Sequence, residues 1–247
     1  MIDDPPAPIS PIKSSSGLTL QPSELAGIAA VEVTDGRHIN DLPWDRYRRL
    51  AKSAQALIEL LDQLKLADQP RILDVGGFDG ALAFFVQPYK INLLDPLTTG
   101  GCGTDIAAPD RAFDLVVSID ALEHIPPEQR QKFIAELCRV SRHGIVLNYP
   151  QALTSQAQAL VHKLTGNPYI AEHVEYALPK TESVVGWLAE ERFHATVQHH
   201  TSVAVWVSHF CLSHLSPVAG HEVGRYLLDN QEGEQGALYE LLTAQRH

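Results

Sequence analysis

A buried strand that runs directly into a glycine-rich turn is the feature that most constrains this chain. Residues 71–75 read Arg-Ile-Leu-Asp-Val, and residues 76–80 supply three glycines before a short apolar helix over 81–86. A strand, a glycine turn and a helix in this order place backbone N–H groups and a helix N-terminus where a polar ligand can bind. A dinucleotide fingerprint would need a glycine at position 78, which is Phe78. The D-x-G-x-x-x-G pattern that remains argues against a nicotinamide oxidoreductase.

Further acidic positions follow at intervals that suit alternating strands and helices. Asp74 lies at the end of the first strand, and Asp95 ends a second short apolar run. A carboxylate at the tip of a second strand is placed to accept hydrogen bonds from a ribose diol. Asp105 follows Gly103-Thr104, and Asp114 opens the apolar run that leads into Asp-Ala-Leu-Glu-His over 120–124.

In this order, the segments from Ile72 to Pro150 resemble the motifs of class I S-adenosylmethionine-dependent methyltransferases, of the type 11-like branch that acts on small molecules. The resemblance is carried by the glycine turn, the Phe-Asp-Leu-Val run at 113–116, the Leu-Glu-His segment at 122–124 and the passage over 133–150. It implies a Rossmann-like α/β fold with a seven-stranded, mostly parallel sheet, an antiparallel last strand and helices on both faces. It also implies S-adenosylmethionine as the cofactor.

The resemblance further implies which residues contact the cofactor. The acidic residue and glycines of the first turn approach its amino-acid end, the second acidic residue its ribose, and the third, with the following N–H, its adenine. The expected cofactor-binding residues are Asp74, Gly76, Gly77, Phe78, Gly80, Asp95, Pro96, Asp105, Ile106, Ser118 and Asp120. Because Phe78 replaces the middle glycine of the motif, we expect the loop to bend through Gly77 with Phe78 packed beneath it.

His124 and His173 are the expected catalytic residues. Methylation of most hydroxyls requires a base, and the pKa of an imidazole suits proton transfer near neutral pH. The alternative for His124 is a structural role, in which a hydrogen bond orients its loop. His173 and Tyr176 lie in segment 168–176, which in this fold commonly covers the acceptor, and Tyr149 ends the fifth strand. Ordinary packing of an aromatic lid is the alternative for these three residues.

A divalent ion is a further hypothesis for the same region. Asp120, Glu123, His124 and His173 resemble the Glu-x-x-Glu-His and distant His that bind such an ion in small-RNA 2′-O-methyltransferases, and carboxylate with imidazole suits it chemically. However, Asp120 is one methylene shorter than the matching glutamate, and many metal-free relatives keep Leu-Glu-His. The sequence therefore assigns no metal ligand.

The composition of the chain limits the kinds of molecule that it can be expected to bind. The 247 residues carry a net charge of −11, which argues against a nucleic acid and leaves a small-molecule acceptor as the expected partner. The three cysteines form neither a disulfide framework nor a zinc motif. Neither an apolar run of about 18 residues nor a signal-peptide pattern is present, so we expect a cytoplasmic protein that does not contact a membrane.

The expected organisation is a flexible tail over 1–20 and a single methyltransferase domain over 21–247. Within the domain we expect a cap helix at 43–66, a cofactor-binding core at 70–150, an acceptor-side insertion at 151–192, and C-terminal strands and a helix at 193–247. The expected strands lie near 71–75, 91–95, 102–106, 114–119 and 144–149, followed by an edge hairpin of 194–199 and 202–209. A last helix over 220–244 would serve as a homodimer contact or as a surface cap.

The sequence thus predicts an S-adenosylmethionine-dependent methyltransferase that acts on a small molecule or biosynthetic intermediate, with oxygen as the accepting atom. Two alternatives stay open. One is a non-catalytic Rossmann-like binding or scaffold protein, supported by Phe78 in the glycine motif. The other is a metal-assisted RNA 2′-O-methyltransferase, which the acidic net charge disfavours.

Overall fold

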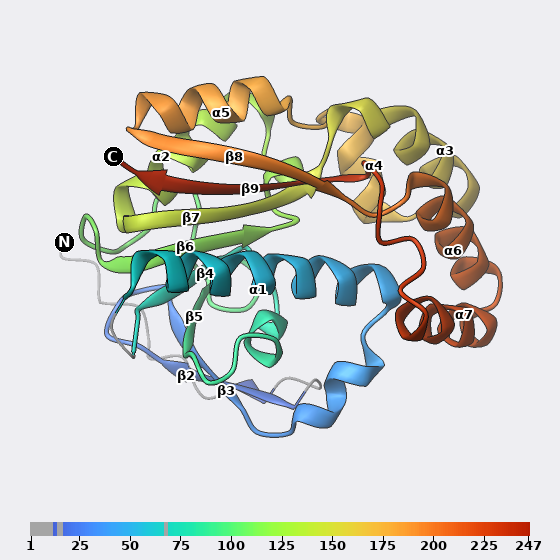
Figure 1. Ribbon diagram of the computed structural model, residues 1–247, viewed down its shortest axis with the longest axis horizontal. Coiled ribbons are helices and arrows are strands. Elements are labelled where there is room, and N and C mark those ends of the chain that lie inside the picture. The colour runs from blue at the N-terminus through green and yellow to red at the C-terminus, as the bar shows by residue number, and fades with distance from the viewer. Residues whose placement is uncertain (1–11, 14–16, 67–68) are drawn as a thin grey trace, which may run out of the picture.

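The computed structural model describes residues 12–13, 17–66 and 69–247. Within these residues one mixed sheet has the strand order β1-β2-β3-β5-β4-β6-β7-β9-β8, with helices on both faces (Figure 1). The predicted Rossmann-like α/β fold is confirmed, but the sheet has nine strands rather than seven. No helix of the described residues is both long and apolar enough to cross a membrane.

The centre of the sheet is parallel. It consists of β5 (Ile91–Leu94), β4 (Ile72–Val75), β6 (Phe113–Ile119) and β7 (Ser141–Pro150). Helices cover both faces, which explains why these strands read as nearly continuous apolar runs. The chain continues from β4 to β5 on one side and then crosses to β6 on the other, and such a reversal opens a crevice at the carboxyl ends of the strands.

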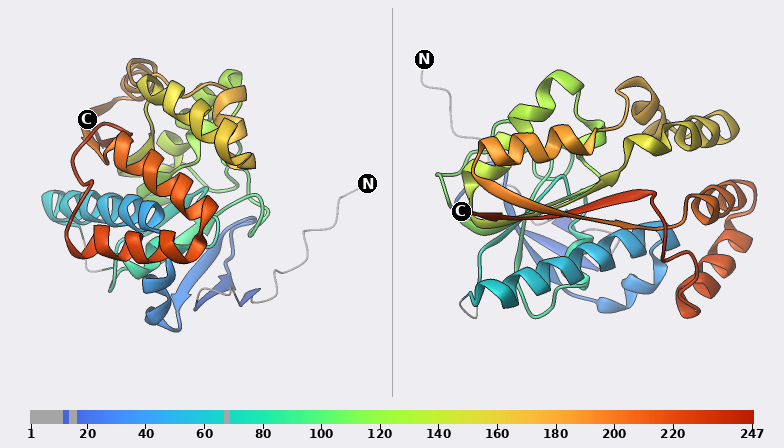
Figure 2. Two further views of the ribbon diagram at one scale, coloured as in Figure 1. Left: turned by 90° about the vertical axis from the view of Figure 1, so that its right-hand side faces the viewer. Right: turned by 45° about the horizontal axis from the view of Figure 1, so that its top comes forward.

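Three long helices cover the faces of this sheet. Helix α1 (Trp44–Leu64) lies along one face, and α2 (Arg130–Val140) and α5 (Thr181–Glu190) lie on the other (Figures 1 and 2). Leu57 and Leu60 of α1 are fully buried against the sheet. The expected cap helix is therefore mainly a sheet-packing helix, and only its first turns reach the carboxyl edge.

The expected parallel strand at 102–106 is wrong. Only an isolated bridge joins Cys102 to Asp105, and the edge of β5 is occupied instead by β3 (Ala29–Val33), which pairs antiparallel with it. Strand β3 pairs in turn with β2 (Leu18–Pro22), and β2 with β1 (Ile12–Lys13). Alternate residues of β2 and β3 are buried, so burial of one face fixes their place in the sheet. Residues 18–20 of the expected tail thus belong to a strand, and most of that tail lies outside the described residues.

The C-terminal region differs most from expectation. Strand β8 (Phe193–His200) agrees with the sequence, but 202–209 lies in helix α6 (Val203–Leu215). Ser202 caps that helix by accepting a hydrogen bond from the Val205 N–H. The expected last helix ends early as α7 (Pro217–Asp229), and strand β9 (Tyr239–Arg246) inserts between β7 and β8, antiparallel to both.

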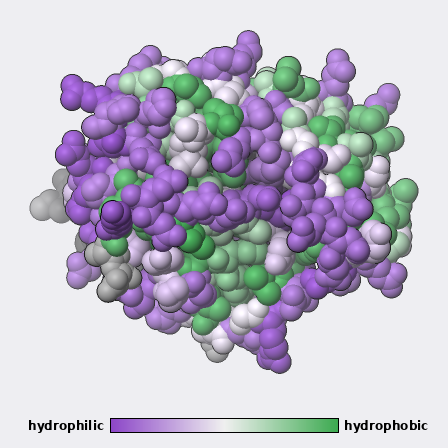
Figure 3. Space-filling view, in the orientation of Figure 1, coloured by the Kyte–Doolittle hydropathy of each residue, from purple (hydrophilic) through white to green (hydrophobic). Residues whose placement is uncertain are grey.

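Four helices form a layer beyond the carboxyl ends of the parallel strands, here called the helical cap. They are α3 (Ser155–Thr165), α4 (Pro168–Glu175), α6 and α7, seen on the right of Figure 1. Gly166 in the left-handed conformation ends α3, and Asn167 accepts two backbone N–H groups to begin α4. Short 3₁₀ turns η1 (Gly36–Asp41), η2 (Ala81–Phe84), η3 (Leu122–His124), η4 (Pro127–Gln129) and η5 (Ala152–Thr154) complete the fold. Figure 3 shows a hydrophilic surface over α1 and hydrophobic residues gathered over the cap.

Candidate active site

A cavity of about 770 Å³ lies between the carboxyl ends of the parallel strands and the helical cap. The loops after β4, β5 and β6 form one side, and the first turns of α1 with α4 and α6 form the other. Its volume lies within the roughly 300–1,000 Å³ typical of small-molecule sites. The topological reversal at β4 therefore opens into a site of the size expected for a cofactor and an acceptor.

The glycine loop after β4 bends differently from the prediction. Positive φ angles occur at Gly76 (79°), Phe78 (54°) and Gly80 (80°). Phe78 is not packed beneath the loop, since it lines the cavity and its side chain is 47% exposed. A left-handed conformation at a residue other than glycine costs about 1–2 kcal/mol. The Phe78 N–H offsets part of this by donating to the carboxylate of Asp95 at 3.1 Å.

Asp74 lies directly below this loop. Its side chain is buried, and a Cβ on Gly77 would overlap its carboxylate. Oδ1 of Asp74 has no hydrogen-bond partner in the described part of the chain. Burial, assisted by the neighbouring charges of Asp95 and Asp79, raises the pKa of Asp74 to about 7. A donor or positive charge bound above the loop would satisfy this carboxylate.

Asp95 connects two loops of the cavity wall. Its carboxylate accepts backbone N–H groups from Phe78 at 3.1 Å, Leu97 at 2.9 Å and Thr98 at 3.2 Å. Oδ2 takes only the first of these, and a carboxylate oxygen accepts about two donors. Asp95 therefore holds the loop after β4 against the turn after β5 and keeps accepting capacity toward the cavity.

Four of the expected cofactor-binding residues do not line the cavity. Asp105 is exposed, and the N–H of Ile106 donates to Glu136 at 2.8 Å, so it is not free for an adenine ring. Ser118 donates to the backbone of β4, and Gly80 packs against Val31 of β3. The cavity wall in this region comes instead from residues 102–104. Asp105 and Ile106 lie differently from expectation because segment 102–106 forms a turn rather than a strand, whereas Ser118 and Gly80 face neighbouring strands.

The remaining expected residues, including Pro96 and Asp120, do line the cavity, and the structure adds Arg49 to them. Arg49 pairs with Asp120 and, at 3.4 Å, with Asp45, whose carboxylate also accepts the hydroxyl of Tyr239 at 3.1 Å. These residues come from α1, the end of β6 and the start of β9. The sequence signal for Arg49 was only a local basic cluster at the start of a helix.

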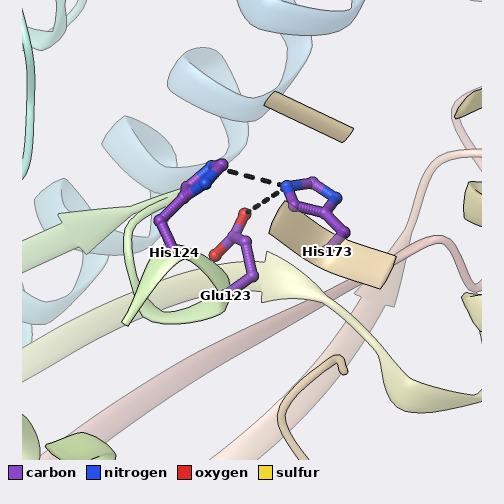
Figure 4. Close-up of side chains that lie close together, drawn as sticks. All are labelled: Glu123, His124 and His173. Atoms are coloured by element: carbon purple, nitrogen blue, oxygen red, sulfur yellow. Dashed lines mark hydrogen bonds and ion pairs between the residues drawn. The ribbon is translucent and has the colours of Figure 1, made fainter. Parts of the chain in front are cut away.

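His124 and His173 are brought together with Glu123, and we call these three residues the acid–histidine cluster. Glu123 and His124 lie in η3 and His173 in α4, and their side chains converge as Figure 4 shows. The two Nε2 atoms are 3.4 Å apart, and Nε2 of His173 is 4.0 Å from Oε1 of Glu123. The structure thus brings together the two histidines named from the sequence, and their catalytic role stays a prediction.

Each imidazole of the cluster has a hydrogen-bond partner at Nδ1, the ring nitrogen that faces away from the other histidine. Nδ1 of His124 lies 2.6 Å from Oε2 of Glu172, and Nδ1 of His173 lies 3.1 Å from Oε1 of Gln158. Burial, with the nearby charges of His124 and Arg49, lowers the pKa of His173 to about 3, so its ring is neutral. Glu172 and Gln158 were not found from the sequence, because no motif marks residues that act by orienting others.

The aromatic wall of the cavity also differs from expectation. Tyr149 is fully buried in the sheet core, and Tyr176 does not line the cavity. Tyr169 of α4 and Trp206 and Phe210 of α6 line it instead. Trp206 falls in segment 202–209, which the sequence predicts as an edge strand, and Phe210 directly follows that segment, so neither was expected in the cavity.

The comparisons with known proteins agree with this fold. Residues 96–147 match the family model described as a methyltransferase domain. A putative methyltransferase from an antibiotic biosynthesis pathway of Anabaena variabilis is similar at 18% identity and a TM-score of 0.54, covering 79% of this chain and 98% of that one. A putative sarcosine dimethylglycine methyltransferase from Galdieria sulphuraria is similar at 15% identity and a TM-score of 0.53, covering 79% and 84%. Curated protein sequences give no match.

The fold, with its cavity at the reversal of strand order, is the Rossmann-like fold of these methyltransferase structures, and residues 96–147 carry the match to a methyltransferase domain. This fold and this match support a class I S-adenosylmethionine-dependent methyltransferase, with S-adenosylmethionine as the cofactor.

Proposed function

We propose that the protein methylates a hydroxyl group of a small molecule or biosynthetic intermediate. The observation that carries this proposal is the acid–histidine cluster, which opens into the same cavity as the glycine loop. When bound, S-adenosylmethionine supplies an activated methyl group for in-line substitution, so that the protein contributes chiefly alignment and exclusion of water.

The residues of the cavity fit such a cofactor. Asp74 has an unpartnered carboxylate oxygen below the glycine loop, where it would attract the cofactor's amino group. Asp95 keeps accepting capacity for ribose hydroxyls. Gly103 and Thr104 take the place expected for Asp105 and Ile106 beside the adenine. The proposed cofactor-binding residues are thus Asp74, Gly76, Gly77, Phe78, Asp95, Pro96, Gly103, Thr104 and Asp120.

Oxygen is favoured as the accepting atom because a hydroxyl must lose a proton when it is methylated. The cluster contains three groups that could accept this proton: Nε2 of His124, Nε2 of His173 and the carboxylate of Glu123. Glu172 fixes the tautomer of His124, since a carboxylate accepts and Nδ1 must then donate. His124 is therefore proposed as a catalytic residue with a defined orientation.

An apolar or aromatic acceptor is favoured by the cavity wall. Tyr169, Ile170, Trp206 and Phe210 surround the end of the cavity formed by the helical cap. The arginines of the wall are already paired with carboxylates, Arg46 with Asp79 at 2.5 Å and Arg49 with Asp120. A phosphate-rich partner would lack free cationic contacts here. The name of the Anabaena variabilis neighbour, which refers to an antibiotic biosynthesis pathway, supports a biosynthetic intermediate.

The proposal is tested in two stages. Calorimetric titration with S-adenosylhomocysteine should give one saturable site, and NADH should give none. The protein is then incubated with S-adenosylmethionine and panels of phenols, catechols, sugars and hydroxylated polyketides, with amines and thiols alongside, and the methylated products are identified by mass spectrometry. Transfer confined to amines or thiols would refute the oxygen assignment. Cofactor binding without transfer to any acceptor would favour the scaffold alternative.

A further inference from the structure

We propose that Glu123, His124 and His173 bind one divalent transition-metal ion of the Zn²⁺ or Co²⁺ type at the wall of the cavity. The first observation is a buried carboxylate without a partner. Glu123 is fully buried, and neither of its oxygens accepts a hydrogen bond from any described residue. Burying a carboxylate without a partner is unfavourable, so a group that neutralises it is expected within reach.

The second observation is the direction of the imidazole lone pairs. The carboxylate of Glu172 can only accept, so Nδ1 of His124 carries its proton, and Nδ1 of His173 faces the oxygen of Gln158 in the same way. A ring that donates only from Nδ1 presents its Nε2 atom to a ligand. The two Nε2 atoms face each other across 3.4 Å with the Glu123 carboxylate beside them (Figure 4). Two imidazole nitrogens and a carboxylate oxygen therefore converge on one point, which is a ligand arrangement that a small cation binds.

The distances suit a small ion. Two imidazole nitrogens bound tetrahedrally at about 2.0–2.1 Å from Zn²⁺ lie about 3.4 Å apart. The Nε2 atoms of His124 and His173 are separated by 3.4 Å, and the ligand atoms of all three residues lie within 4.8 Å of one another. The Glu123 carboxylate would close in by roughly an ångström to complete a bond of about 2.0–2.2 Å.

The residues around the cluster orient its two histidines as the neighbours of metal ligands do. Metal-bound histidines commonly donate their other ring N–H to a carboxylate or carbonyl oxygen, which fixes the ring and increases its basicity. Glu172 and Gln158 do this for His124 and His173. Asp120 is not part of the site, because it is paired with Arg49. The ligand set is therefore two imidazoles and one carboxylate, with the remaining coordination position facing the cavity.

An open position of this kind can bind an acceptor oxygen and lower the pKa of its hydroxyl. That use of the ion rests on the proposed function, whereas binding of the ion does not. With the ion in place, the cluster would act on the hydroxyl through the metal rather than through the free lone pair of His124.

The test uses the full chain after dialysis against a chelator, with no cofactor or acceptor present. We expect Zn²⁺ to bind with one ion per chain by calorimetry, and Co²⁺ to give the visible absorption of a tetrahedral site. Glu123→Gln and His173→Gln should each weaken binding at least tenfold. The matched control is His194→Gln, because His194 and His247 form a surface pair with ring centroids 5.7 Å apart that could bind Zn²⁺ adventitiously. This variant should bind as the original protein does.

If a variant is too unstable for calorimetry, the effect of Zn²⁺ on the Tm of each protein provides a second measurement of binding. Zn²⁺ should raise the Tm of the original protein and of His194→Gln, and should not raise that of Glu123→Gln, His173→Gln or His124→Gln. Absence of one-to-one binding would overturn the proposal and leave the cluster as a proton-sharing pair. Binding that survives Glu123→Gln and His173→Gln, or that is lost in His194→Gln, would also overturn it. None of these outcomes bears on S-adenosylhomocysteine binding, which tests the methyltransferase assignment separately.

Discussion

Gly77 lies directly over the carboxylate of Asp74, so that a methyl group on Gly77 would overlap its oxygens. The glycine is thus required by a close approach between the loop and the end of β4, and not by its φ angle, which is ordinary. This contact explains why the second glycine of the turn cannot carry a side chain without displacing the first acidic residue.

Gly77→Ala should therefore destabilise the fold by about 1–3 kcal/mol, the usual cost of overpacking, and weaken S-adenosylhomocysteine binding. Gly186→Ala is the matched control, because Gly186 lies within α5 with no atom within 4 Å of a new Cβ. That change should stabilise the protein by about 0.5–1 kcal/mol. Urea unfolding and calorimetry measure both effects. Equal behaviour of the two variants would contradict the steric role of Gly77.

Asp95→Ala should weaken S-adenosylhomocysteine binding by about 1–3 kcal/mol, because the N–H groups of Phe78, Leu97 and Thr98 lose their shared acceptor. Asp105→Ala should change the affinity by less than about 0.5 kcal/mol, as expected for an exposed residue outside the cavity. Calorimetric titration compares the two. An unchanged affinity in Asp95→Ala would remove the ribose assignment, and a large loss in Asp105→Ala would restore the original adenine assignment.

His124→Ala should abolish methyl transfer to a hydroxyl acceptor and leave S-adenosylhomocysteine affinity nearly unchanged. The reason is that His124 belongs to the acid–histidine cluster, whereas the glycine loop and Asp95 hold the cofactor. His214→Ala, an exposed change in α6, is the control and should keep full turnover. If His124→Ala turns over normally, the residue has the structural role that was its alternative.

Asp74 should make stability depend on pH in the direction opposite to most carboxylates. Burial raises its pKa from 3.8 to about 7 in the folded protein, so the folded state holds a proton that the unfolded chain releases. The stabilising contribution is fully present below about pH 4 and is lost as the pH rises through about 7. At about 1.4 kcal/mol for each pKa unit, the full loss is at most about 4 kcal/mol.

Asp74→Asn removes this titration. Between pH 4 and pH 8 the original protein should therefore lose stability relative to the variant, measured as the difference between their free energies of unfolding. Urea unfolding at several pH values, without cofactor, measures the difference. Parallel curves for the two proteins would show that Asp74 is ionised in the folded state, and would contradict the effect of burial described above.

The parts of the fold that the sequence predicted are those fixed by local pattern. Strands β4 to β7 are buried on both faces, and their apolar runs end in Asp74, Asp95 and Asp120 within a few residues of the expected positions. The sequence predicts a strand at 202–209, because a short apolar run has no period that separates strand from helix. It is helical because Ser202 caps it and Trp206 is buried in the same apolar cluster as Trp44 of α1.

In the site, too, some features follow from the local sequence and others from tertiary packing. Its glycines and acidic residues follow strands directly, so neighbouring residues in the chain determined the turn at 76–80 and the carboxylate at 95. The pairing of His124 with His173, the pairing of Arg49 with Asp120, and the replacement of the strand at 102–106 by β3 join segments far apart in the sequence. Only the tertiary structure decided these, because which segments share a cavity wall or a sheet edge depends on how the whole chain packs and not on the order of residues within any one segment.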